Sequence, residues 1–322
     1  MSRGLDTVAE DAALLALLKG LRARGYRWTT PTPETQRRIV ARPERQVARD
    51  LAGIFGWNLP FAPITIGPEL LDLMRVGGIV VARGALLAST LRVSSLGDAL
   101  FLHSAYPTSQ SDAVFFGPDT YRFARFVAAE LKHGGRPAGR PIRRLVDIGC
   151  GSGAGAITTA LATGAASVVM TDINQAALRL ARINASAAGV AAEAVLCDVL
   201  QSVPGTFDLV IANPPYMIDD AARAYRHGGD RLGAGLSLRI ACETAARLAE
   251  GGRLLLYTAS AIVDGVDDFQ AAVVPALEAL GLRVAYNEID PDVFGEELER
   301  PAYRTVERIA VVGVSAVKGR TT

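Results

Sequence analysis

Hydrophobic and polar positions follow one pattern in the first third of the chain and another in the rest. Residues 6–25 carry leucines at helical spacing. A second helix is predicted to begin after Thr32 as N-cap with Pro33 at its first position, and a third near Pro68. Short hydrophobic runs typical of strands follow at 79–81, 90–93 and 100–103. We therefore predict an α+β cap and substrate-recognition domain over residues 1–108, with the element order of a winged-helix module.

Five arginines are expected on the second helix: Arg37, Arg38, Arg42, Arg45 and Arg49. Arginines in such a row can contact the phosphates of a nucleic acid. A solvated charged helix face is the alternative interpretation, and it is the more common one.

From Arg143 onward, hydrophobic strands alternate with helical segments, as in a doubly wound α/β sheet. The predicted strands are 145–148, 167–170, 194–196 and 207–212, with a helix over 174–188 between the second and third. The strand at 145–148 runs into a glycine-rich loop, residues 149–155, where backbone can approach a ligand closely. We assign residues 109–322 to this second domain.

Acidic residues follow the next two strands. Asp172 lies 19 residues after Gly153, the distance at which a carboxylate reaches ribose hydroxyls in dinucleotide-type folds. Asp198 follows the strand at 194–196. Because ligands bind at the carboxyl edge of such sheets, these side chains are expected to meet at one site.

The strand at 207–212 ends in Asn213-Pro214-Pro215-Tyr216. Two prolines make the turn rigid and leave carbonyls without competing N–H groups. The Asn213 side-chain oxygen and the Pro214 carbonyl could accept both hydrogen bonds of a planar amino group, while Tyr216 stacks on its face. An ordinary Asn-Pro turn is the alternative.

Composition narrows the class of protein. The chain has 322 residues, half of them apolar, and a formal charge of +1, which indicates a globular protein without a broadly basic surface. Three scattered cysteines without a paired motif predict neither disulfides nor a metal site. Acidic residues near the N-terminus do not fit a signal peptide, and no apolar run suits a membrane span, so we expect a cytoplasmic protein.

The glycine loop alone also satisfies the loose NAD(P) fingerprint. The surroundings favour S-adenosyl-L-methionine, because Asp147 precedes the loop, where it can hold the loop and approach the amino acid part of that cofactor. Asp198 is placed to bind the adenine amino group. Neither a hydride-transfer set of residues nor a phosphate-binding lysine motif is present.

These motifs, in this order, resemble class I S-adenosylmethionine-dependent methyltransferases of the small-domain group with an Asn-Pro-Pro-Tyr motif. The resemblance covers residues 109–322 and implies a Rossmann-like, seven-stranded domain. It implies that the loop and the strand ends bind cofactor, through Asp147, Gly149, Cys150, Gly151, Gly153, Asp172, Ile173, Asp198, Val199 and Asn213. It also implies that Asn213, Pro214, Pro215 and Tyr216 bind the methyl acceptor, with Asn213, Pro214 and Tyr216 catalytic.

Within the group, the chain is most similar to release-factor glutamine N5-methyltransferases, which share a cap domain and a glycine turn after the tyrosine, here residues 227–233. Those enzymes carry an Arg-Pro-Glu-Thr-Glu-like segment where this chain has Phe-Gly-Pro-Asp-Thr-Tyr at 116–121. An RNA base amino group therefore stays open beside a protein glutamine as the acceptor. A small-molecule N-methyltransferase and a cofactor-sensing, nucleic-acid-binding regulator are further alternatives, and the oligomeric state is left open.

Overall fold

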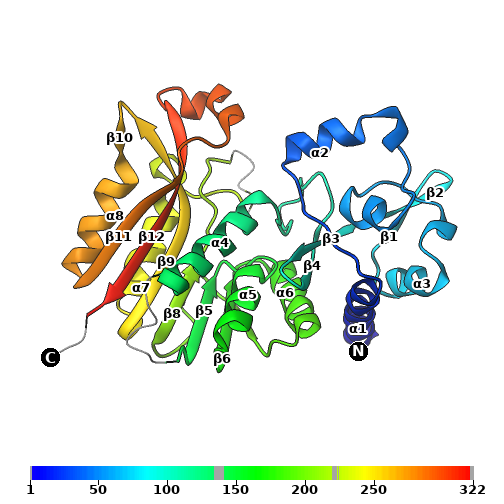
Figure 1. The fold of residues 1–322 in the computed structure, drawn as a ribbon, viewed down its shortest axis with the longest axis horizontal. Coiled ribbons are helices and arrows are strands. Elements are labelled where there is room, and N and C mark those ends of the chain that lie inside the picture. Colours follow the sequence, from blue (N-terminus) through cyan, green and yellow to red (C-terminus); the bar gives the residue numbers. More distant parts are fainter. Residues whose placement is uncertain (1, 134–140, 220–222, 224, 320–322) are drawn as a thin grey trace.

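The computed structural model describes residues 2–133, 141–219, 223 and 225–319. Its two parts lie beside each other, with the N-terminal elements on one side and a large twisted sheet with its helices on the other (Figure 1). No helix in the described part of the chain is long and apolar enough to cross a bilayer.

The N-terminal part, which we call the cap, begins with three helices and continues as two antiparallel hairpins. These elements are α1 (Ser2–Ala23), α2 (Pro33–Val40), α3 (Pro68–Val76), β1 (Val80–Arg83), β2 (Leu86–Ser89), β3 (Leu91–Leu96) and β4 (Ala99–Ser104). β1 pairs with β2 and β3 with β4, as two separate sheets. The three predicted helices and the mixed α+β character are confirmed, and the likeness to a winged-helix module is limited to the element order.

The predicted length of the second helix was wrong. Thr32 caps α2 by accepting from the backbone of Thr35, as expected, but the helix ends at Val40. Pro43 disfavours helical geometry at the residue before it, and Arg42 is extended. Three of the five arginines of this segment, at positions 42, 45 and 49, therefore lie beyond the helix.

The main sheet has the strand order β11-β12-β9-β8-β5-β6-β7, and β10 pairs with β9. Its strands are β5 (Arg144–Ile148), β6 (Ser167–Asp172), β7 (Glu193–Leu196), β8 (Phe207–Ala212), β9 (Leu248–Val263), β10 (Val266–Asp267), β11 (Leu282–Asp290) and β12 (Arg308–Lys318). The five strands from β9 to β7 run parallel, whereas β12 is antiparallel to both of its neighbours. This is the predicted Rossmann-like sheet of seven strands, with the short β10 added.

Helices cover both faces of the sheet (Figure 1). They are α4 (Pro118–His133), α5 (Ala154–Thr163), α6 (Gln175–Ala188), α7 (Gly235–Ala245) and α8 (Asp268–Ala279). Alternate residues of β5 and β8 point to opposite faces: Leu145 and Leu209 pack with α4, α5 and α6, and Val146 and Val210 with α7 and α8. Both faces are buried, which explains why these strands read as continuous hydrophobic runs.

The cap is tied to the sheet through α6. Asn184, which is fully buried, accepts from the backbone N–H of Leu102 at 2.8 Å and donates to the carbonyls of Leu102 at 3.1 Å and Ser152 at 2.9 Å. One side chain thus joins β4 of the cap, α6 and the glycine loop. The predicted domain boundary at residue 108 stays a prediction.

Candidate active site

A cavity of about 420 Å³ lies at the carboxyl edge of the parallel strands. The predicted site residues that line it are Asp147, Gly149, Cys150, Gly151, Asp172, Ile173, Asp198, Val199, Asn213, Pro214, Pro215 and Tyr216. They come from the ends of four strands, β5, β6, β7 and β8. Side chains as far apart in the sequence as Asp147 and Tyr216 therefore share one cavity, which we call the sheet-edge cavity.

The first two glycines of the loop face this cavity. Gly149 and Gly151 have positive φ, and the position of a Cβ on either would meet nothing within 4 Å. Gly153, also at positive φ, faces the protein instead: a Cβ there would lie 3.2 Å from Ala181 and Met170. Gly153 does not line the cavity; it is the N-cap residue of α5.

Asp172 connects the glycine loop to the start of α6. Its carboxylate accepts from the backbone N–H of Gly151 at 2.9 Å and of Asn174 at 2.8 Å. Burial raises the pKa of Asp172, while these backbone donors favour the ionised form. The carboxylate is thereby held in place at the cavity wall.

Asp147 is almost fully buried beneath the loop and accepts from the backbone N–H of Ala156 at 2.7 Å. A Cβ on Gly155 would lie 2.7 Å from the same carboxyl oxygen, so glycine is required there. Burial raises the pKa of Asp147 to about 7. The charge of this group therefore changes near neutral pH.

Asp198 is paired with Arg239 of α7, which sequence reasoning did not identify. The guanidinium donates to both carboxylate oxygens, at 2.6 and 2.7 Å, and hydrogen bonding to Arg239 lowers the pKa of Asp198. Arg239 also lines the cavity. The pair keeps the Asp198 carboxylate ionised at the cavity wall.

The turn after β8 presents free acceptors. Asn213 is half-buried and Pro214 is buried. Among the described residues, no hydrogen bond engages the Asn213 side chain or the Pro214 carbonyl. Glycines pack beneath the turn: Cβ atoms on Gly228 and Gly233 would clash with the backbone of Tyr216. The glycine turn thus supports Asn213-Pro214-Pro215-Tyr216 from below.

Tyr216 is held by a carboxylate that the sequence analysis did not single out. Its hydroxyl donates to Asp119 at 2.7 Å, and Tyr257 donates to the other oxygen at 3.2 Å. Asp119 lies in the first turn of α4 and lines the cavity. Burial raises the pKa of Tyr216, so its phenol stays neutral. The centroid of its ring lies 6.1 Å from that of Phe294, another residue of the cavity wall that was not predicted.

Comparison with known proteins shows the family to which this chain belongs. Residues 136–262 match the family described as Methyltransferase small domain. The release factor glutamine methyltransferase of Cereibacter sphaeroides is 36% identical over 278 residues, which span 81% of this chain and 92% of that relative. The chain belongs to the S-adenosylmethionine-dependent methyltransferases of the small-domain family.

Two further comparisons involve RNA-modifying methyltransferases. The ribosomal RNA small subunit methyltransferase C of Chromohalobacter salexigens is 34% identical over 122 residues, 38% of this chain and 32% of that relative. The solved T. thermophilus 16S rRNA N2 G1207 methyltransferase, in complex with AdoMet and guanosine, is 17% identical, with a TM-score of 0.44, over 81% of this chain and 64% of that one.

The cofactor of this methyltransferase is S-adenosyl-L-methionine, and the sheet-edge cavity fits it. Gly149 and Gly151 leave open space where side chains would stand, so a ligand can lie against the loop backbone. Carboxylates at the ends of three strands, Asp147, Asp172 and Asp198, offer acceptors for an ammonium group, hydroxyls and an amino group.

Proposed function

We propose that this methyltransferase transfers a methyl group to the side-chain amide nitrogen of a glutamine in a protein. The observation that carries the proposal is the turn of Asn213 and Pro214, whose two oxygen acceptors have no partner among the described residues and border the cofactor cavity. The likeness to the glutamine methyltransferase supports it, because that match extends well beyond residues 136–262.

An amide nitrogen is a poor nucleophile because its lone pair is delocalised. The Asn213 oxygen and the Pro214 carbonyl accept its two N–H bonds and thereby favour the pyramidal, electron-rich geometry of the transition state. When bound, S-adenosyl-L-methionine supplies a methyl group on a positively charged sulfur. The rigid turn aligns the acceptor nitrogen with that group, which lowers the entropic part of the barrier.

The other residues position the two partners. With the cofactor bound, Asp172 would accept from the ribose hydroxyls, Asp147 would face the amino acid part, and Asp198 and Val199 would flank the adenine. Tyr216 contributes its ring to the acceptor site, and its bond to Asp119 keeps the turn in one conformation. The new N–C bond forms as the C–S bond breaks, so the sulfur leaves as a neutral thioether. The methylated nitrogen then loses one N–H proton to solvent, because in this proposal no residue acts as a strong base.

An RNA base amino group is the second candidate acceptor. It is favoured by Arg42, Arg45 and Arg49 of the cap, which are exposed and have no ion pair among the described residues. The partial likeness to the ribosomal RNA enzyme is in keeping with it.

The acceptor can be identified by methyl transfer from labelled S-adenosyl-L-methionine into a fractionated cell lysate. We expect the label in protein, at the size of a release factor. Label confined to ribosomal RNA would replace the proposal by the second candidate, and label in small molecules would overturn both.

A further inference from the structure

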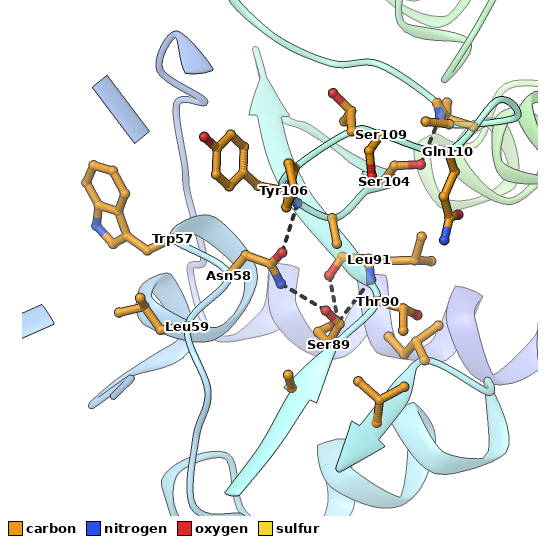
Figure 2. Close-up of a pocket in the computed structure, with 18 of the residues that line it drawn as sticks. Trp57, Asn58, Leu59, Ser89, Thr90, Leu91, Ser104, Tyr106, Ser109 and Gln110 are labelled. Carbon is orange, nitrogen blue, oxygen red and sulfur yellow. Dashed lines mark hydrogen bonds between the residues drawn. The ribbon is translucent and has the colours of Figure 1, made fainter. Parts of the chain in front are cut away.

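The cap contains a second cavity, of about 790 Å³, which we call the cap cavity. Its walls come from the region around α2, from the hairpin β1–β2 and from residues 104–114, the strap that leads from β4 toward α4. Figure 2 shows Asn58, Ser89 and Tyr106 together at this cavity, with Ser109 and Gln110 further along the strap. Ala113 and Val114 line both this cavity and the sheet-edge cavity, so the two share a wall.

The side chain of Asn58 joins three segments of the cavity wall through hydrogen bonds. Asn58 donates to the carbonyl of Ser89 at 2.9 Å and accepts from the backbone N–H of Tyr106 at 2.9 Å (Figure 2). The strap is bound at two more points: the hydroxyl of Tyr225 donates to the carbonyl of Thr108, and Asn174 donates to that of Asp112. These bonds preform the cavity and link its wall to residues of the methyltransferase site.

A buried acceptor in the cavity wall has no partner. Gln36 is only 1% exposed, and its amide nitrogen donates to the carbonyl of Trp57 at 2.7 Å. Its side-chain oxygen has no hydrogen bond among the described residues, although Gln36 lines the cavity. A buried polar atom left in this state costs free energy, which a ligand with an N–H or O–H donor would recover.

Cations that lack partners lie in the same wall. Arg45 and Arg83 line the cavity, are exposed, and form no ion pair within the described part of the chain. Arg179 also lines the cavity, but its guanidinium forms ion pairs with Glu10 and Asp11, each with an N···O distance of 2.6 Å. Among the lining residues only Asp112 adds a further carboxylate. The charges at the cavity, three arginines against Glu10, Asp11 and Asp112, therefore balance in number, and the cations left without an ion pair among the residues that the structure describes are Arg45 and Arg83.

We propose that the cap cavity binds a nucleotide of a single-stranded RNA. The base donates to the oxygen of Gln36, and the phosphates on either side of it bind Arg45 and Arg83. A free phosphate fits less well, because it is small for this volume and has few protons to donate. The inference goes beyond the proposed function, since it concerns what the cap binds and holds for either acceptor. Because of the shared wall, the bound strand lies next to the acceptor site.

Binding of a labelled single-stranded RNA of about ten nucleotides and mixed sequence tests this by fluorescence anisotropy, without cofactor. We expect wild-type binding that weakens with salt. In the double variant Arg45→Gln/Arg83→Gln we expect affinity about tenfold lower, and a salt slope smaller by about 1.4, because each lost phosphate contact removes about 0.7. Gln36→Met should weaken binding about tenfold without changing the slope, since it removes a base contact.

The matched control is Arg22→Gln/Arg283→Gln, which removes the same charge from exposed positions of α1 and β11 outside the cavity. An equal loss in this control would overturn the assignment to the cavity, as would wild-type protein that does not bind RNA. Unchanged affinity in a folded Gln36→Met would overturn the base contact. Displacement of the RNA by poly-glutamate at equal charge concentration would indicate that the cavity binds an acidic protein segment instead of RNA. None of these outcomes depends on whether glutamine is methylated.

Discussion

The two cavities of this methyltransferase differ in how their walls are made. The predicted residues of the sheet-edge cavity, such as Gly149, Asp172 and Asn213, follow consecutive strands, and each has a fixed place in a motif. The cap cavity is lined by residues from α1 to α6 that share no motif, such as Gln36, Asn58 and Arg83. A site at the edge of a parallel sheet can be predicted from the sequence, whereas a site between irregular segments is visible only after folding.

The largest effect is expected at the acceptor turn. Asn213→Ala removes one of the two proposed acceptors, and we expect kcat to fall about a hundredfold to a thousandfold, as for the loss of other preorganised catalytic hydrogen bonds. Binding of S-adenosyl-L-methionine, measured by calorimetry, should stay within a few-fold of wild type. Asn213→Asp keeps an acceptor oxygen and should retain more activity. Wild-type turnover in Asn213→Ala would remove the turn from the mechanism.

The contact between the cap and the main sheet depends on Asn184. Asn184→Ala leaves the backbone N–H of Leu102 and two carbonyls without partners in the interior, and we expect the free energy of unfolding to fall by about 3 kcal/mol. Urea denaturation measures this. Asn287→Ala, an exposed asparagine on β11, is the control and should change little. Equal stability of the two variants would show that cap and sheet do not depend on this side chain.

Tyr216→Phe separates the ring from the hydroxyl. Loss of the bond to Asp119 should lower stability by about 1 kcal/mol and raise the KM for the acceptor, with little change in cofactor affinity. Tyr286→Phe loses a similar bond, to Asp267, away from the cavity. It should lose similar stability with unchanged KM. If both variants behave alike in the kinetic assay, the Asp119 contact is structural only.

The smallest effect concerns pH. Because the pKa of Asp147 is raised to about 7, its carboxyl is protonated below that pH and charged above it. If it faces the ammonium of the cofactor, affinity for S-adenosyl-L-methionine should rise as pH increases through about 7. Asp147→Asn should flatten that dependence. In this pH range the folded protein holds a proton on Asp147 that the unfolded chain releases. The raised pKa of Asp147 therefore lowers the free energy of unfolding as pH rises from about 4 to about 7.

The accuracy of the sequence predictions follows the same division. The strands at 145–148 and 207–212 and the helix after Asn174 were predicted within about a residue or two, because buried parallel strands are continuous hydrophobic runs and Asn174 is an N-cap residue. The second strand of the first hairpin, β2, was missed, since Leu86-Leu87-Ala88-Ser89 has neither alternation nor β-branched residues.

The side chains that the sequence analysis missed in the site share one property. Asp119, Arg239 and Phe294 reach the cavity from α4, α7 and the segment before β12, each more than twenty residues from the nearest predicted site residue. Their contacts exist only because the sheet brings these segments together. An acidic residue in the first turn of a helix, as at Asp119, is usually explained by the helix dipole, so its pattern alone does not indicate a site.

The chemical position of the transferred methyl group shows whether the acceptor is an amide nitrogen, an oxygen or a sulfur. Acceptor labelled from S-adenosyl-L-methionine is hydrolysed in acid, and the labelled product is identified. We expect labelled methylamine, released from a methylated side-chain amide. Labelled methanol released by mild base, which would indicate a methyl ester, or label on sulfur would contradict the claim that Asn213 and Pro214 hold a planar nitrogen for methylation.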